Sequence, residues 1–122
     1  MGKTKKKDWT RTKDYRQLNA DLLQGLSDAG MDNARYKDLV DEYMVCWVQL
    51  QELNEDIRER GTRVEYKNGS QTGLTENKSL GTKIRLLKAM DDIFRRLGFT
   101  EEAKAKRAAA AKDLGGDEDD EL

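Results

Sequence analysis

A broad apolar face recurs at helical spacing over residues 33–60, in a chain that contains no proline. Apolar residues three and four positions apart share one face of an α-helix. Two rows repeat every seven residues; they are Tyr36, Tyr43, Leu50 and Ile57, and Leu39, Cys46 and Leu53. Without proline nothing interrupts the helix, and Gly61 is well placed to end it. The pattern predicts one long helix over 33–60.

The segment 44–48, Met-Val-Cys-Trp-Val, is apolar on every side of this predicted helix. Such a segment must be covered on every side. A chain of 122 residues, 36% hydrophobic and 39% charged, has few elements to cover it. We therefore expect a homo-oligomer. Its predicted interface comprises Tyr36, Tyr43, Met44, Val45, Trp47, Val48 and Leu50.

Shorter helical patterns lie on both sides of this helix. Leu18, Leu22 and Leu26 predict a helix over 14–28, and two apolar rows predict another over 76–97 that ends at Gly98. Residues 99–112 have high helix propensity but no apolar stripe beyond alanine, so we expect an exposed helix. The predicted fold is all-α and oligomeric. Residues 14–98 are the predicted helical core and oligomerisation domain, in which one shorter helix precedes a long antiparallel helical hairpin. A helical extension over 99–112 follows.

Residues 62–75 join the two long helices and do not have a helical pattern. A phosphate-binding loop of the Walker type needs Gly-x-x-x-x-Gly-Lys-Ser/Thr after a buried strand. Here Gly69 and Gly73 are only four positions apart, and the residue directly before Lys78-Ser79 is asparagine rather than glycine. We interpret the stretch as a β-hairpin-like connector that turns at Asn68-Gly69, with Thr75 or Asn77 capping the next helix.

The charge of the chain is strongly asymmetric although its net charge is −1. Residues 1–13 are interpreted as a flexible basic arm, which attracts polyanions through their phosphates. Residues 113–122 carry six acidic side chains, and we expect a disordered tail. The predicted DNA-binding residues are Lys3, Lys5, Lys6, Lys7, Trp9, Arg11, Lys13 and Arg16. The residues predicted to dock a partner are Asp117, Glu118, Asp119, Asp120 and Glu121.

Two features of this charge pattern leave alternatives open. Trp9, among lysines and arginine, can stack on nucleic-acid bases or pack against the helices. Each charged end can also be a solubilising segment. If the arm does not hold DNA, the second choice is a set near the tip of the connector: Arg58, Arg60, Arg63 and Lys67.

The inventory of reactive side chains is small. The chain has no histidine and one cysteine, which removes Cys–His catalysis and almost every zinc site. Adjacent acids such as Asp91-Asp92 diverge by about 100° on a helix and do not face each other. We expect no enzyme activity, no metal site and no cofactor. We also expect no membrane span, since no apolar run approaches ~20 residues, and no signal peptide; this favours a cytoplasmic setting.

Several short motifs over 36–102 resemble the small subunit of bacteriophage terminase, a family found with many long-tailed phages. In that family one helix ends in glycine, a loop often carries Asn-Gly, and a second helix starts after Asn-Pro and ends in a Leu-Gly-Leu-Thr-Pro type break. The matching residues here are Gly61, Asn68-Gly69, Asn77, Leu80 and Leu97-Gly98-Phe99-Thr100. Lys78 and Glu101 stand where the family often has proline, and no helix-turn-helix fits within 1–32.

The resemblance implies a non-catalytic, ring-shaped homo-oligomer in the host cell cytoplasm. Such a ring binds viral double-stranded DNA and presents it to the terminase large subunit, which carries the ATPase and nuclease. The alternative from the residues alone is a self-associating helical adaptor or regulatory protein with a basic nucleic-acid-binding arm.

Overall fold

The computed structural model describes residues 7–120 and is mostly helical. A short 3-10 helix, η1, covers Trp9–Arg11 and leads into α1, Lys13–Asp28. The long helices are α2, Ala34–Arg60, and α3, Ser79–Arg96. Strands β1, Arg63–Asn68, and β2, Gln71–Glu76, lie between them, and α4, Glu101–Asp120, follows.

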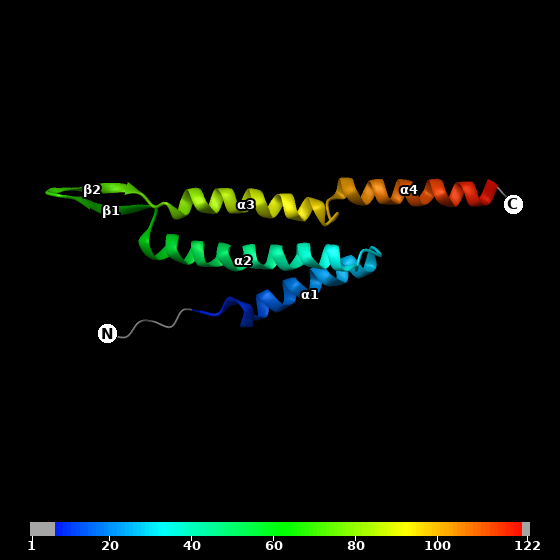
Figure 1. The fold of residues 1–122 in the computed structure, drawn as a ribbon, viewed down its shortest axis with the longest axis horizontal. Coiled ribbons are helices and arrows are strands. Elements are labelled where there is room, and N and C mark those ends of the chain that lie inside the picture. The colour runs from blue at the N-terminus through cyan, green and yellow to red at the C-terminus, as the bar shows by residue number, and fades with distance from the viewer. Residues whose placement is uncertain (1–6, 121–122) are drawn as a thin grey trace.

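The elements form an elongated molecule (Figure 1). Helices α2 and α3 run antiparallel and pack along each other, and α1 packs against the first half of α2. The β1–β2 hairpin projects from one end of this helical body, and α4 extends from the other end. The helical hairpin, its β-hairpin connector and the shorter helix before it are confirmed.

Side-chain caps and glycines set the helix ends. Asn33 Oδ1 accepts a hydrogen bond from Tyr36 N, and Thr100 Oγ1 accepts one from Ala103 N. Gly61 and Gly98 have φ angles of 78° and 76° where α2 and α3 end. Both values lie in the left-handed region that only glycine adopts freely.

Helix α3 begins at Ser79, three positions later than the predicted start at 76. The reason is that β2 continues through Glu76, so Thr75 pairs across the ribbon with Val64 and cannot cap a helix. Asn77 follows the strand and accepts a hydrogen bond from Ser79 N. Of the two capping candidates, only Asn77 therefore contacts the first turn of α3.

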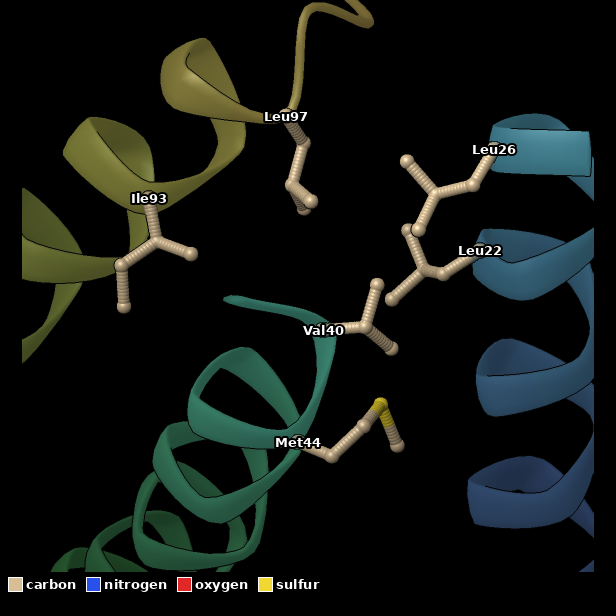
Figure 2. Close-up of a cluster of buried hydrophobic side chains, with 6 residues drawn as sticks. All are labelled: Leu22, Leu26, Val40, Met44, Ile93 and Leu97. Carbon is tan, nitrogen blue, oxygen red and sulfur yellow. The ribbon is translucent and has the colours of Figure 1, made fainter. Parts of the chain in front are cut away.

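The core lies where α1, α2 and α3 meet (Figure 2). Helices α1 and α2 contribute two side chains each, α3 contributes one, and Leu97 follows α3 directly. The six side chains point toward one another: Leu22, Leu26, Val40, Met44, Ile93 and Leu97. Leu26, Val40 and Leu97 are completely buried. Met44, predicted as an interface residue, is 1% exposed and belongs to this intrachain core. Part of the all-round apolar segment is thus covered by the chain's own α1.

The β-hairpin has a two-residue loop, Gly69–Ser70, because Asn68 pairs with Gln71. Gly69 has a φ of 64°, whereas Asn68 does not have a positive φ. The predicted turn is in place, but Gly69 alone supplies the positive φ, as in a type II′ turn. Tyr66 lies opposite Gly73, and a Cβ at Gly73 would come within 2.9 Å of the tyrosine ring. Glycine at 73 thus makes room for the ring.

Helix α4 runs to Asp120, past the predicted end at residue 112. The two glycines at 115 and 116 lower helix propensity by about 1 kcal/mol each, but they keep the backbone N–H groups that a helix needs. The helix therefore includes residues 113–120, where the sequence predicts a disordered tail. The remainder of that predicted tail, residues 121–122, lies outside the described residues.

Candidate functional site

A partly buried polar network closes the end of the helical body from which the β-hairpin projects. Its centre is Asn77, which is 0% exposed. Asn77 Nδ2 donates to Asp56 Oδ2 at 3.1 Å and to the Gly61 carbonyl oxygen at 3.0 Å. Asn77 Oδ1 accepts from Arg60 Nη2 at 3.2 Å and from Ser79 N at 3.0 Å. The amide thus makes four hydrogen bonds, the full set expected of a satisfied buried amide.

Asp56 is the shared acceptor of this network. Arg60 Nε and Nη2 donate to the Asp56 carboxylate at 2.6 and 2.8 Å, and Ser79 Oγ donates to it at 2.7 Å. The hydrogen bonds from Arg60, Ser79 and Asn77 hold the pKa of the Asp56 carboxyl well below its usual range. The carboxylate is therefore ionised at neutral pH, and its bonds are charge-assisted.

This network attaches the β-hairpin to both long helices. Asp56, Arg60 and Gly61 come from the end of α2, and Ser79 begins α3. Asn77 N also donates to the Thr62 carbonyl oxygen at 2.9 Å, which extends the ladder of the ribbon by one bond. The hairpin is thus held at its base by side chains and backbone together, so its direction relative to α2 and α3 is fixed.

Sequence reasoning found one member of this network and missed the rest. Asn77 is predicted only as a cap, and the Glu55-Asp56 pair is a further case of adjacent acids that do not face each other on a helix. The four-residue spacing of Asp56 and Arg60 is the one local signal, since such pairs meet on a helix. The bonds from Asp56 to Asn77 and Ser79 join residues more than twenty positions apart, and no local pattern encodes them.

Basic side chains predominate in the ribbon and the first half of α3, whereas residues 52–60 at the end of α2 carry four acidic and two basic side chains. Residues 63–88 contain six basic and two acidic side chains. Of the second-choice set, Arg60 is committed to Asp56, whereas Arg58, Arg63 and Lys67 are exposed. Among the residues that the structure describes, Lys78, Lys83 and Lys88 on or beside α3 have no ion-pair partner. Their charges are therefore available to an external polyanion.

The structure describes only some of the predicted DNA-binding residues of the N-terminal arm. Lys3, Lys5 and Lys6 lie outside the described residues. Lys7, Arg11, Lys13 and Arg16 are exposed, and Arg11 pairs with Asp8 at 3.4 Å. Lys7 precedes η1, Arg11 ends it, and Lys13 and Arg16 lie in the first turn of α1.

Trp9 is half-buried and packs against the helices. Its ring meets that of Trp47 edge to face, with 5.9 Å between centroids, and Tyr15 meets Trp47 at 5.8 Å. Lys7 Nζ lies 4.1 Å from the centroid of the Trp9 ring, a cation–π contact. Of the two alternatives for Trp9, the structure shows packing against the helices. Contact between Trp9 and DNA stays a prediction.

An apolar groove of about 380 Å³ lies between α2 and α3. It brings three predicted interface residues, Tyr43, Trp47 and Leu50, together with four residues of α3 that the prediction omits. Those are Leu87, Met90, Asp91 and Phe94. Leu87 is 44% exposed, and nearby on the same helix Ile84 is 57% exposed. The omission has a simple cause, because the prediction considered α2 alone.

The other predicted interface residues lie on different sides of α2. Val45 is 58% exposed, while Tyr36 and Val48 are half-buried. Cys46 is half-buried as well, and desolvation raises the pKa of its thiol. The thiol is therefore protonated at neutral pH and lacks the thiolate character of a reactive cysteine.

The predicted partner-docking residues Asp117, Glu118, Asp119 and Asp120 belong to the last part of α4, and Glu121 lies outside the described residues. Within residues 7–120, no cluster of three or more acidic or cysteine side chains is arranged to hold a metal ion. Across that same range, every helix is too short or too polar to cross a membrane.

One of the comparisons with known proteins found a match. A sequence model of the family described as "Phage terminase, small subunit" matches residues 15–113. The match covers α1, both long helices, the β-hairpin and the first half of α4. No curated protein and no solved structure matches the chain.

The Asn77 network generates a stability prediction. Asn77→Ala leaves the Gly61 carbonyl and the Ser79 N–H without their side-chain partner, so we expect a loss of about 2 kcal/mol in unfolding free energy. Lys78→Ala removes an exposed side chain in the same turn and is expected to change it by less than about 0.5 kcal/mol. Urea unfolding followed by circular dichroism measures both. Equal stability of the two variants would contradict a structural role for Asn77.

Proposed function

Because the chain belongs to the family of phage terminase small subunits, as the match over residues 15–113 shows, we propose that it is the non-catalytic DNA-binding subunit of a viral packaging machine. In this role it assembles with copies of itself in the host cell cytoplasm, binds viral double-stranded DNA and presents it to the large subunit, which carries the ATPase and nuclease. The family match is the observation that carries the proposal.

The N-terminal basic arm is the proposed non-specific DNA contact. Lys7, Arg11, Lys13 and Arg16 are exposed, and Lys3, Lys5 and Lys6 precede them in sequence. Lysine and arginine that neutralise phosphates release counterions, which gives affinity without sequence selectivity. Several copies of the arm in one assembly would multiply this weak contact through effective concentration.

Deleting residues 2–7 tests this contact. The deletion removes four lysines, so affinity for any duplex should fall by a similar factor, and the slope of log affinity against log salt should flatten by roughly 0.9 per lost phosphate contact. Replacing the same four lysines with arginine keeps the charge and should keep the affinity. Fluorescence anisotropy across a salt series measures both quantities. An unchanged slope after the deletion would indicate that DNA contacts Arg58, Arg63 and Lys67 instead of the arm.

The groove between α2 and α3 is the proposed contact between copies of the chain. Its lining is largely aromatic and aliphatic, and Leu87 and Ile84 expose apolar surface beside it. Apolar surface of this kind is typical of an interface. The occupant we propose is a second copy, which would also cover Tyr43, Trp47 and Leu50. Because Met44 is buried within its own chain, we leave it out of this proposed contact.

Leu87→Glu should lower the assembly state, because it places a charge in the groove without touching the intrachain core. Trp47→Glu should do so too, but it also breaks the contacts with Trp9 and Tyr15. Ala89→Glu is the matched control, since Ala89 is exposed two positions along the same helix. Analytical ultracentrifugation gives the masses. A wild-type chain that sediments as a monomer at tens of micromolar would overturn the proposal.

The acidic end of the chain is the proposed docking segment for a basic surface of the large subunit. Asp113 and residues 117–121 carry six negative charges, which also repel DNA. Ending the chain at residue 112 should therefore raise DNA affinity at low salt and abolish binding to purified large subunit. A truncated chain that still binds the large subunit would exclude docking through this segment. An adaptor unrelated to packaging would not bind the large subunit in either form.

A further inference from the structure

The β1–β2 hairpin is a polar ribbon that stands clear of the helical body (Figure 1). From Glu65 to Thr72 every residue is exposed. Residues 66–75 contain no acidic side chain, and the tip consists of Lys67, Asn68, Gly69, Ser70, Gln71 and Thr72. Nothing in the intrachain packing requires this composition, because these side chains contact solvent.

The cross-strand register places hydrogen-bonding side chains on both faces of the tip. Lys67 lies opposite Thr72, and Asn68 lies opposite Gln71. Directly opposite residues share a face of an antiparallel ribbon, so one face carries an ammonium and a hydroxyl, and the other carries two amides. Lysine, asparagine, glutamine, serine and threonine are side chains that recognise base edges in DNA.

The ribbon is preorganised. The Asn77 network and the bond from Asn77 N to the Thr62 carbonyl fix its base to α2 and α3. Tyr66 covers Gly73 across the two strands, which stiffens a ribbon that is marginal by itself. A fixed element loses less conformational entropy on binding than a flexible one.

The segment 63–88 is mainly basic, whereas residues 52–60 at the end of α2 carry four acidic and two basic side chains. Arg63 lies at its base, and Lys78, Lys83, Arg85 and Lys88 follow along α3. Glu65 and Glu76, the two acidic residues of 63–88, lie toward the base rather than at the tip. A polar tip flanked by cations matches the chemistry of a DNA groove, in which base edges lie between two rows of phosphates.

We propose that the β1–β2 hairpin enters the major groove of duplex DNA and reads base edges with Lys67, Asn68, Gln71 and Thr72, while cations of α3 contact the flanking phosphates. The major groove admits a two-stranded β-ribbon. This inference rests on the proposed DNA binding and adds the element that would select a sequence. The N-terminal arm would then supply affinity, and the ribbon would supply selectivity.

A protein partner fits the tip less well than DNA does. The exposed apolar residues of the ribbon, Tyr66 and Leu74, lie between the tip and the base rather than at the tip. Interfaces between proteins centre on buried aromatic or aliphatic anchors, and the segment from Lys67 to Thr72 has none. Contact between the tip and a second copy is nevertheless one outcome that the test distinguishes.

In the test, the full-length protein is mixed with DNA duplexes whose central base pairs are randomised. The duplexes that it binds are then recovered and sequenced. We expect the wild type to enrich a common sequence. A variant with Lys67→Ala, Gln71→Ala and Thr72→Ala, which keeps the Gly69–Ser70 turn, should lose preference for that sequence by ~10-fold or more per lost base contact. Its affinity for unrelated duplex should fall by less than about threefold, because the arm remains.

The matched control is Lys13→Ala with Arg16→Ala, which should weaken binding to all duplexes alike and leave the enriched sequence unchanged. Circular dichroism and sedimentation show whether each variant keeps its fold and assembly state. Undiminished selectivity in the ribbon variant, or a wild type that binds DNA without any sequence preference, would overturn this inference but not the proposed function. A ribbon variant that selects normally but assembles poorly would instead identify the tip as a contact between copies. A wild type that binds no duplex at all would overturn both this inference and the proposed function.

Discussion

The buried Asn77 amide is the interaction on which the arrangement of the hairpin end depends. Two long helices joined by a ribbon need a fixed angle at the junction, and apolar packing is sparse there because the core lies where α1 meets α2 and α3. Asn77 solves this by bonding to α2 through Asp56 and Gly61, and to α3 through Ser79. A buried polar group is costly unless every bond is made, so the junction has one favoured geometry.

That geometry separates the proposed activities along the molecule. The ribbon lies at one end and the acidic segment of α4 belongs to the other, with the α2–α3 groove between them. The N-terminal arm joins the body at Trp9, whose ring packs on Trp47 beside that groove. The proposed phosphate contact and the proposed contact between copies are therefore neighbours.

Local sequence patterns predict much of this fold, and long-range polar contacts account for most of what they miss. The spacing of Leu22 and Leu26, and the caps at Asn33 and Thr100, give helix positions because helix ends are satisfied by nearby residues. Asp56 and Asn77 have no such local signature, because their partnership exists only once α2 and α3 are antiparallel. The sequence also predicts too early an end for α4, at residue 112, because glycine weakens a helix without ending it. For the candidate site, the charge pattern of the sequence is enough to propose the basic arm. The groove cannot be predicted in the same way, because its lining forms only when α3 packs beside α2.

Hydrogen–deuterium exchange of the full-length protein, with and without duplex DNA, tests most directly where DNA is held. If the hairpin end and the arm bind DNA together, added duplex should slow exchange of backbone amides in residues 63–76 and in the residues before 17, and leave 101–112 unchanged. A result in which DNA binds and residues 63–76 exchange at the same rate, while protection appears elsewhere, would contradict a hairpin that enters the DNA groove.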